Sequence, residues 1–255
     1  MKISEYYQSN ETPVLSLELN LKNGLDDQTI AQLQHCQQVT YFSLVNHSDT
    51  MEAWSEKIRQ AGQIQAILQK PVLLHFPAAG LTEDNLSQLK QELQVAHIEN
   101  LLVLRGDGWR PSHNYKTPDL LAALAQDFDL AATINPGAPT EEIIIDAQRK
   151  QSAGASYLIS QAFFDNAEFD RTQHVLKAAD LNLPLVAGLF YFPSTDDFQA
   201  LMARFKMTEE KYDYPAHFFT QVETLKSAGI HLFAPHPDQK IWNWLQSDYK
   251  GHKSL

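Results

Sequence analysis

Short apolar runs recur along this chain at nearly regular intervals, and longer polar stretches separate them. The runs are apolar at almost every position, which is typical of strands buried on both faces of a parallel sheet. Eight runs are found, and they begin at Val14, Val39, Pro71, Asn100, Asp129, Ser156, Leu183 and Ile230. Their starts lie 25 to 32 residues apart, except for a last interval of 47 residues.

The stretches between the runs carry helix start and stop signals. Thr82 precedes Glu83 and Asp84, which suits a capped helix N-terminus and its dipole. Another stretch opens at Pro139 and closes at Gly154. The last interval holds two helical patterns, "TDDFQALMARF" and "AHFFTQVETLKSAG". Eight strand–helix repeats of this length predict an α/β fold of the (β/α)8 TIM-barrel class rather than a doubly wound open sheet.

The chain shows no sign of a second domain. No linker rich in Gly, Pro or Ser divides the 255 residues, so we predict one barrel domain over residues 1–255. Within it, residues 1–12 are expected to be an N-terminal extension, and residues 237–255 a C-terminal helix and tail.

The charge balance limits the kinds of partner that this protein is expected to bind. There are 20 basic and 31 acidic side chains, a net charge of −11, which argues against binding nucleic acid or an anionic membrane surface. The N-terminus lacks the apolar core of a signal peptide, and no apolar run approaches a membrane span. A single cysteine, Cys36, excludes an internal disulfide. We therefore expect a cytoplasmic protein with a small-molecule partner, and the sequence leaves open whether it forms a homo-oligomer.

Polar residues interrupt or follow several of the apolar runs. Glu18 lies inside the first run, His75 ends the third, Arg105 and Asp107 follow the fourth in "LLVLRGDGW", and Gln161 ends the sixth. In a barrel of this class the active site forms at the C-terminal ends of the strands. Because buried polar groups are costly without partners, their convergence at one rim predicts a binding or catalytic site.

Each of these residues also has a purely structural explanation. Glu18 could form a structural salt bridge with a core cation such as Arg105. His75 alone is more often a histidine satisfied within the core. Lys150, in "DAQRKQSAG", would usually lie on a solvated helix face.

A wider pattern resembles a known family. "LRGD" at Leu104–Asp107 after an apolar strand is similar to the signature of the methylenetetrahydrofolate reductase family. "AGASYLISQAFFD" resembles another segment of that family, with Gln161 and Asp165 in place. The resemblance extends from about Val14 to about Pro235. It implies a (β/α)8 barrel that binds FAD and reduces 5,10-methylenetetrahydrofolate to 5-methyltetrahydrofolate with NADH or NADPH.

The resemblance also implies a role for each candidate residue. Glu18 would be the catalytic acid that opens the imidazolidine ring of the folate, a task for a carboxyl kept protonated by apolar surroundings. Asp107 would hold the pterin and tune the flavin, and Gln161 would complete pterin recognition. Phe198 would offer a stacking wall to the substrate. No metal ligand is implied, and the implied cofactor-binding residues are His75, Leu104, Arg105, Gly106, Asp146 and Lys150.

Some stretches depart from the family pattern, mostly on the FAD side. Ile134 and Ala138 stand where a flavin-stacking Tyr and a phosphate-reaching His are expected. Three functions therefore remain open. The first, which the resemblance favours, is a flavin-dependent reductase. The second is a flavin-free folate enzyme that works by direct hydride transfer or one-carbon transfer. The third is a non-catalytic protein that binds folate or regulates a partner.

Overall fold

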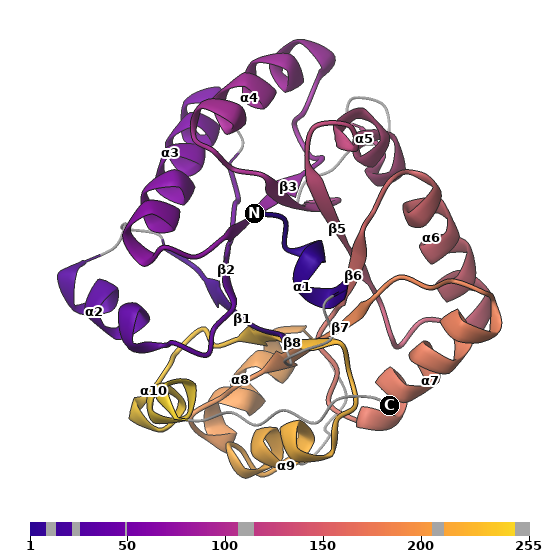
Figure 1. Cartoon of the computed structure of the whole chain (residues 1–255). Coiled ribbons are helices and arrows are strands. Elements are labelled where there is room, and N and C mark those ends of the chain that lie inside the picture. The colour runs from indigo at the N-terminus through magenta and orange to yellow at the C-terminus, as the bar shows by residue number, and fades with distance from the viewer. Residues whose placement is uncertain (9–13, 22–25, 49, 107–114, 206–211, 248–255) are drawn as a thin grey trace.

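The computed structural model is a closed barrel of eight parallel strands in chain order, ringed by helices (Figure 1). This confirms the predicted (β/α)8 class and all eight predicted strands. The structure describes residues 1–8, 14–21, 26–48, 50–106, 115–205 and 212–247. The strands are β1 (Val14–Leu19), β2 (Tyr41–Leu44), β3 (Val72–Pro77), β4 (Asn100–Leu104), β5 (Asp129–Ile134), β6 (Tyr157–Ser160), β7 (Leu185–Phe190) and β8 (Gly229–Phe233).

The helices follow the start and stop signals of the sequence. Thr82 is the N-cap of α4, and its backbone N–H donates to Asn85 Oδ1 at 2.7 Å. Gly154 directly follows the C-cap of α6 and has a φ of +101°, a positive φ of the kind that glycine provides after a helix. None of the described helices is both long enough and apolar enough to cross a membrane. The helices are α1 (Ser4–Gln8), α2 (Asp27–His35), α3 (Met51–Leu68), α4 (Glu83–Val95), α5 (Thr117–Leu124), α6 (Thr140–Ser152), α7 (Asn166–Ala178), α8 (Thr195–Phe205), α9 (Ala216–Thr224) and α10 (Gln239–Gln246).

Side chains alternate along each strand, so one set packs against the helices and the other points into the barrel. On β1, Leu15 and Leu17 belong to the large cluster that includes the apolar faces of the helices, whereas Val14 belongs to a second cluster inside the barrel. Ser16 and Glu18 share the face of Val14, because side chains two residues apart in a strand point the same way. The barrel interior is therefore apolar at the level of Val14 and polar near the C-terminal end of β1.

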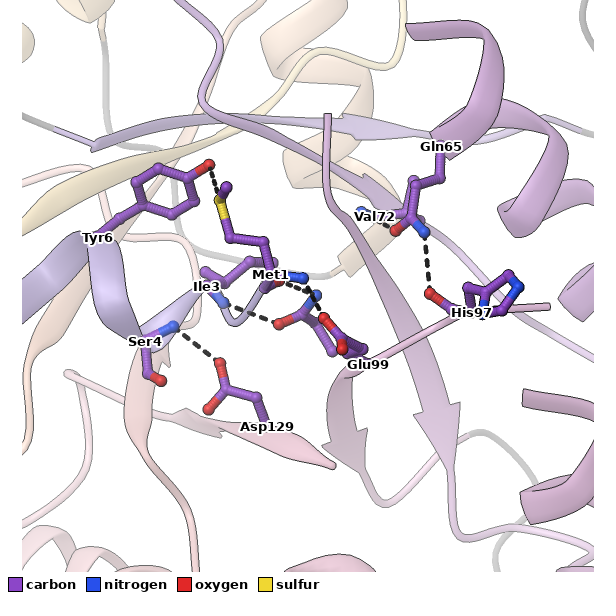
Figure 2. A network of polar contacts seen from close by, with 10 residues as sticks. Met1, Ile3, Ser4, Tyr6, Gln65, Val72, His97, Glu99 and Asp129 are labelled. Carbon is purple, nitrogen blue, oxygen red and sulfur yellow. Dashed lines mark hydrogen bonds and ion pairs between the residues drawn. The ribbon is translucent and has the colours of Figure 1, made fainter. Parts of the chain in front are cut away.

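Residues 1–8 close the opposite end of the barrel, where the strands begin (Figures 1 and 2). Helix α1 lies across the centre of the ring of strands, and Ile3 is fully buried there. The backbone N–H of Ile3 donates to Asn100 Oδ1, and that of Ser4 donates to Asp129 Oδ2, both at 2.8 Å. Tyr7 packs on Tyr157, with ring centroids 4.9 Å apart. This part of the expected N-terminal extension is thus packed into the barrel, because its apolar side chains fill the lumen.

Candidate functional site

Glu18 lies on the inner wall of the barrel between two histidines. It is the last residue but one of β1, and its side chain is 21% exposed. Its Oε2 atom is 3.5 Å from Nε2 of His75 on β3 and 3.7 Å from Nε2 of His231 on β8. The structure therefore brings Glu18 and His75 together at one rim. Arg105 is exposed, and the ion pairs that Glu18 makes within the described chain are with the two histidines. The Arg105–Glu18 bridge is not formed.

Two buried serines hold the histidines in place. Ser16 Oγ lies 2.7 Å from His231 Nδ1, and its hydroxyl also donates to the carbonyl oxygen of Ile230 at 3.3 Å. Ser43 Oγ lies 2.9 Å from His75 Nε2. Ser43 pairs with Glu18 in the register of β1 and β2. Each imidazole is thus oriented by a hydroxyl on a neighbouring strand.

The surroundings of Glu18 favour its ionised form. Burial raises the pKa of Glu18, but the neighbouring imidazoles of His231 and His75 outweigh it and bring the pKa below the ordinary 4.5. This differs from the expectation of a carboxyl kept protonated by an apolar strand, because that expectation left out the two histidines. Burial also lowers the pKa of His75 from 6.5 to about 4, against the opposing charge of Glu18. At neutral pH the free protein therefore holds an ionised Glu18 beside a neutral His75.

The low pKa of His75 makes stability depend on pH. Between pH 6.5 and about 4 the unfolded chain binds a proton at this histidine and the folded chain does not, so stability is full above 6.5 and falls as the pH drops. A shift of this size corresponds to about 3 kcal/mol of unfolding free energy. We expect urea unfolding in a chelator-containing buffer to show this loss between pH 7 and pH 4.5. The loss of unfolding free energy should be smaller in His75→Gln than in the wild type. In His174→Gln, which alters an exposed histidine of α7, it should equal the wild-type loss. Equal losses in all three proteins would contradict the assignment.

A pocket of about 350 Å³ opens beside Glu18 at the C-terminal ends of β1, β7 and β8. Most of the residues that line it are apolar, and among the described residues Glu18 is its one charged group. Phe190 and Phe233 form part of the wall, with ring centroids 5.1 Å apart, and both remain partly exposed. A larger hollow of about 730 Å³ lies on the outer surface over α3 and α4. We place the candidate site at the smaller pocket, because barrels of this class bind their substrates at the C-terminal ends of the strands.

The "LRGD" stretch lies at the end of β4. Leu104 is partly buried, and Arg105 is exposed. Gly106 has φ of +79°, and a Cβ atom there would lie 2.7 Å from Pro77 Cβ. The glycine is therefore required by the turn and by the close approach of the end of β3. Asp107 lies outside the described residues, so its predicted pterin contact stays a prediction.

The two residues implied on the substrate side differ in their surroundings. Gln161 directly follows β6, and its side chain is exposed at that strand end. Phe198 is only 1% exposed and lies within an aromatic cluster, with ring centroids 4.9 Å from Tyr214 and 5.3 Å from Phe164. Phe198 does not line the pocket beside Glu18. Its role as a stacking wall stays a prediction, and in this structure it packs the core.

The implied FAD contacts on α6 are already bonded to protein groups. Lys150 is buried, and its Nζ bonds Asp146 Oδ2 at 2.5 Å and the carbonyl oxygen of Thr133 at 2.7 Å. Ile134 and Ala138 are also buried. An ammonium group has three donors, and Lys150 uses two of them on protein groups in a buried position. The described residues on this side therefore do not fit FAD, and we derive no chemical step through it.

His231, Phe190 and Phe233 were not predicted as site residues. The sequence "IHLFAPH" carries a signal for two of them, because alternation puts His231 and Phe233 on the same face of a strand. The ligand atoms of Glu18, His75 and His231 all lie within 4.8 Å of one another, so these residues could hold a metal ion, which the resemblance did not imply.

Solved structures with the same architecture support the fold alone, because their sequences are only distantly similar. Tryptophan synthase from M. tuberculosis, in an open form with BRD0059 bound, is 12% identical with a TM-score of 0.56 over 90% of this chain and 86% of that one. A structure from Aquifex aeolicus VF5 is 10% identical, with a TM-score of 0.58 over 96% and 94% of the two chains. Phosphoenolpyruvate phosphomutase from Streptomyces platensis subsp. rosaceus is 13% identical, with a TM-score of 0.55 over 91% and 79%.

A family model gives the more specific result. The model described as methylenetetrahydrofolate reductase matches residues 25–230. His75, Arg105 and Gln161 lie inside the matched segment, whereas Glu18 and His231 lie just outside it. Since the match spans well over half of a chain that folds as the barrel implied by the resemblance, this protein belongs to the methylenetetrahydrofolate reductase family.

Proposed function

We propose that this protein binds 5,10-methylenetetrahydrofolate in the pocket beside Glu18 and reduces it to 5-methyltetrahydrofolate with NADH or NADPH. The observation that carries the proposal is a partly buried carboxylate on the wall of a strand-end pocket, in a barrel of this family. Phe190 and Phe233 support it, because their partly exposed rings give flat apolar surfaces on which a pterin can stack.

The reaction needs one proton and one hydride. As the bond between a ring nitrogen and the methylene carbon breaks, the nitrogen takes the proton and the carbon becomes part of an iminium. The hydride of the nicotinamide then adds to that carbon, which gives the methyl group and the oxidised nicotinamide. Glu18 is the candidate proton donor, since general acids of this kind are carboxyls held near the departing atom.

Glu18 is ionised in the free protein, so it must take up a proton before it can donate one. Burial is the largest single influence on the pKa of Glu18, and it raises that pKa. A folate that fills the pocket displaces water and increases this effect. We therefore infer that substrate binding is accompanied by proton uptake at Glu18, while His75 and His231 keep its carboxylate in position.

The hydride can reach the folate by two routes, through FAD or directly from the nicotinamide. The family resemblance implies FAD, whereas the ion pair of Lys150 with Asp146 and the buried Ile134 and Ala138 favour direct transfer from the nicotinamide to the folate. Visible absorbance of the purified protein separates the two. Flavin bands support the FAD version, and a colourless protein that does not take up added FAD supports the direct one.

Folate binding at this pocket can be tested by Phe233→Ala. Loss of a stacking ring should weaken the binding of 5,10-methylenetetrahydrofolate about two- to tenfold, since such contacts are worth about 0.5 to 1.5 kcal/mol. Isothermal titration calorimetry measures this directly. Phe219→Ala is the matched control, because Phe219 is a partly buried phenylalanine of α9 that packs on Trp244 outside the pocket. A wild-type protein that does not bind the folate, or equal weakening in both variants, would contradict the proposal.

A further inference from the structure

We propose that Glu18, His75 and His231 form a binding site for a Zn²⁺ ion on the inner wall of the barrel, beside the pocket that Glu18 lines. We call these three residues the Glu18 triad. Within the described part of the chain they are the one group of three such side chains whose ligand atoms come together, all within 4.8 Å of one another. Each comes from a different strand, β1, β3 and β8, so the barrel itself sets their spacing.

The separations suit one small cation. Nitrogen and oxygen ligands lie about 2.0 to 2.1 Å from zinc, so neighbouring ligand atoms in a tetrahedral site are about 3.4 Å apart. Glu18 Oε2 is 3.5 Å from His75 Nε2 and 3.7 Å from His231 Nε2. Small side-chain rotations are enough to place all three atoms around one ion.

The hydrogen bonds of His231 prepare it as a ligand. In the tautomer that can bind a metal through Nε2, His231 Nδ1–H donates to Ser16 Oγ, 2.7 Å away, while the hydroxyl of Ser16 donates to the carbonyl oxygen of Ile230 at 3.3 Å. The other ring nitrogen, Nε2, then carries a lone pair. This atom is buried and has no hydrogen-bond partner among the described residues, and it lies 3.7 Å from Glu18 Oε2. A lone pair facing a carboxylate is stabilised by a cation between them.

Ser16 therefore acts as a positioning residue for the metal ligand His231. Metal-binding histidines commonly donate their second ring nitrogen to a protein acceptor, which fixes the tautomer and the ring orientation. Ser43 acts differently, because its hydroxyl contacts Nε2 of His75, the ligand atom itself. Metal binding requires this hydroxyl to turn away from the nitrogen.

The donor set selects a transition cation. Two imidazoles and one carboxylate suit zinc, whereas magnesium and calcium favour oxygen ligands. Three protein ligands leave at least one coordination position open. Because Glu18 also lines the pocket, we expect the open position on that side, where it can hold a water molecule or an oxygen, nitrogen or sulfur atom of a bound molecule.

This site stands apart from the proposed reduction. A carboxylate that binds zinc cannot also carry the proton that the reduction needs, so the zinc-bound protein is a different state from the reductase. Zinc binding is measured without folate or nicotinamide. A failure of the reductase proposal therefore leaves the zinc result unaffected, and the reverse also holds.

The test is a zinc titration of chelator-treated full-length protein, in competition with a chromophoric chelator. We expect one Zn²⁺ per chain, a higher melting temperature with zinc, and visible absorption bands when Co²⁺ replaces zinc. Glu18→Gln and His231→Gln should weaken zinc binding at least about 100-fold, because each removes a direct ligand. Both replacements keep a hydrogen-bonding side chain, and their own melting temperatures show whether they fold.

His236→Ala is the matched control, since His236 is an exposed histidine in the loop after β8. Its zinc affinity should equal that of the wild type. Equal affinity in the wild type, Glu18→Gln and His231→Gln would overturn the site, as would a wild-type protein that binds no zinc. Loss of binding in His236→Ala with retention in both triad variants would place the ion elsewhere and equally overturn it.

Discussion

Glu18→Gln is expected to lower the rate of methylenetetrahydrofolate reduction by about 10² to 10⁴-fold, which is the usual contribution of a positioned general acid. Glutamine keeps the size and polarity of the side chain, but it cannot deliver a proton. Folate binding should therefore remain close to that of the wild type, so the loss falls on kcat. Steady-state kinetics in a chelator-containing buffer, together with calorimetric folate binding, measure the two effects separately.

The pH profile gives this prediction a second readout. Because the pKa of Glu18 is lowered in the free protein, only a small fraction of the carboxyl is protonated at neutral pH. The wild-type kcat/KM should therefore rise as the pH falls toward that pKa, and this rise should be missing in Glu18→Gln. Glu142→Gln, an exposed change on α6, is the control and should behave as wild type. Unchanged turnover in Glu18→Gln would refute Glu18 as the acid. Folate binding without turnover in the wild type would favour the non-catalytic alternative.

Ile3→Ala is expected to lower the free energy of unfolding by about 2 to 4 kcal/mol. Ile3 is fully buried in the cluster that fills the start of the barrel, together with Tyr7 and Tyr157. Its truncation leaves a cavity that the closed ring of strands cannot easily collapse. The hydrogen bond from its backbone N–H to Asn100 remains, so the effect reports side-chain packing.

Urea unfolding of Ile3→Ala and Ile145→Ala makes the comparison. Ile145 lies on α6 and is 47% exposed, so the same chemical change there should alter stability by less than about 0.5 kcal/mol. Equal, small losses in both variants would show that residues 1–8 do not stabilise the barrel.

Local patterns in the sequence determined the barrel. Eight apolar runs and the helix signals between them depend on neighbouring residues alone, so they predicted every strand and the N-terminus of α4. The same patterns placed Glu18 and His75 at one rim, because the C-terminal ends of parallel strands meet there. Helix α9 ends at Thr224, earlier than its sequence pattern suggested, since a boundary depends on the packing of the next strand.

The partners of each polar group were decided only by the tertiary structure. His231 meets Glu18 because closure of the barrel pairs β8 with β1, and Ser16 lies opposite His231 in that register. Burial keeps His75 neutral and the two histidines keep Glu18 ionised, which no single strand encodes. Lys150 bonds Asp146 and Thr133 instead of facing solvent, and Phe198 is enclosed by aromatic rings. Periodicity along the chain determines the face of a strand or helix on which a side chain lies. The neighbours of that side chain across the lumen depend on strand order and register, because these bring together residues that are far apart in sequence.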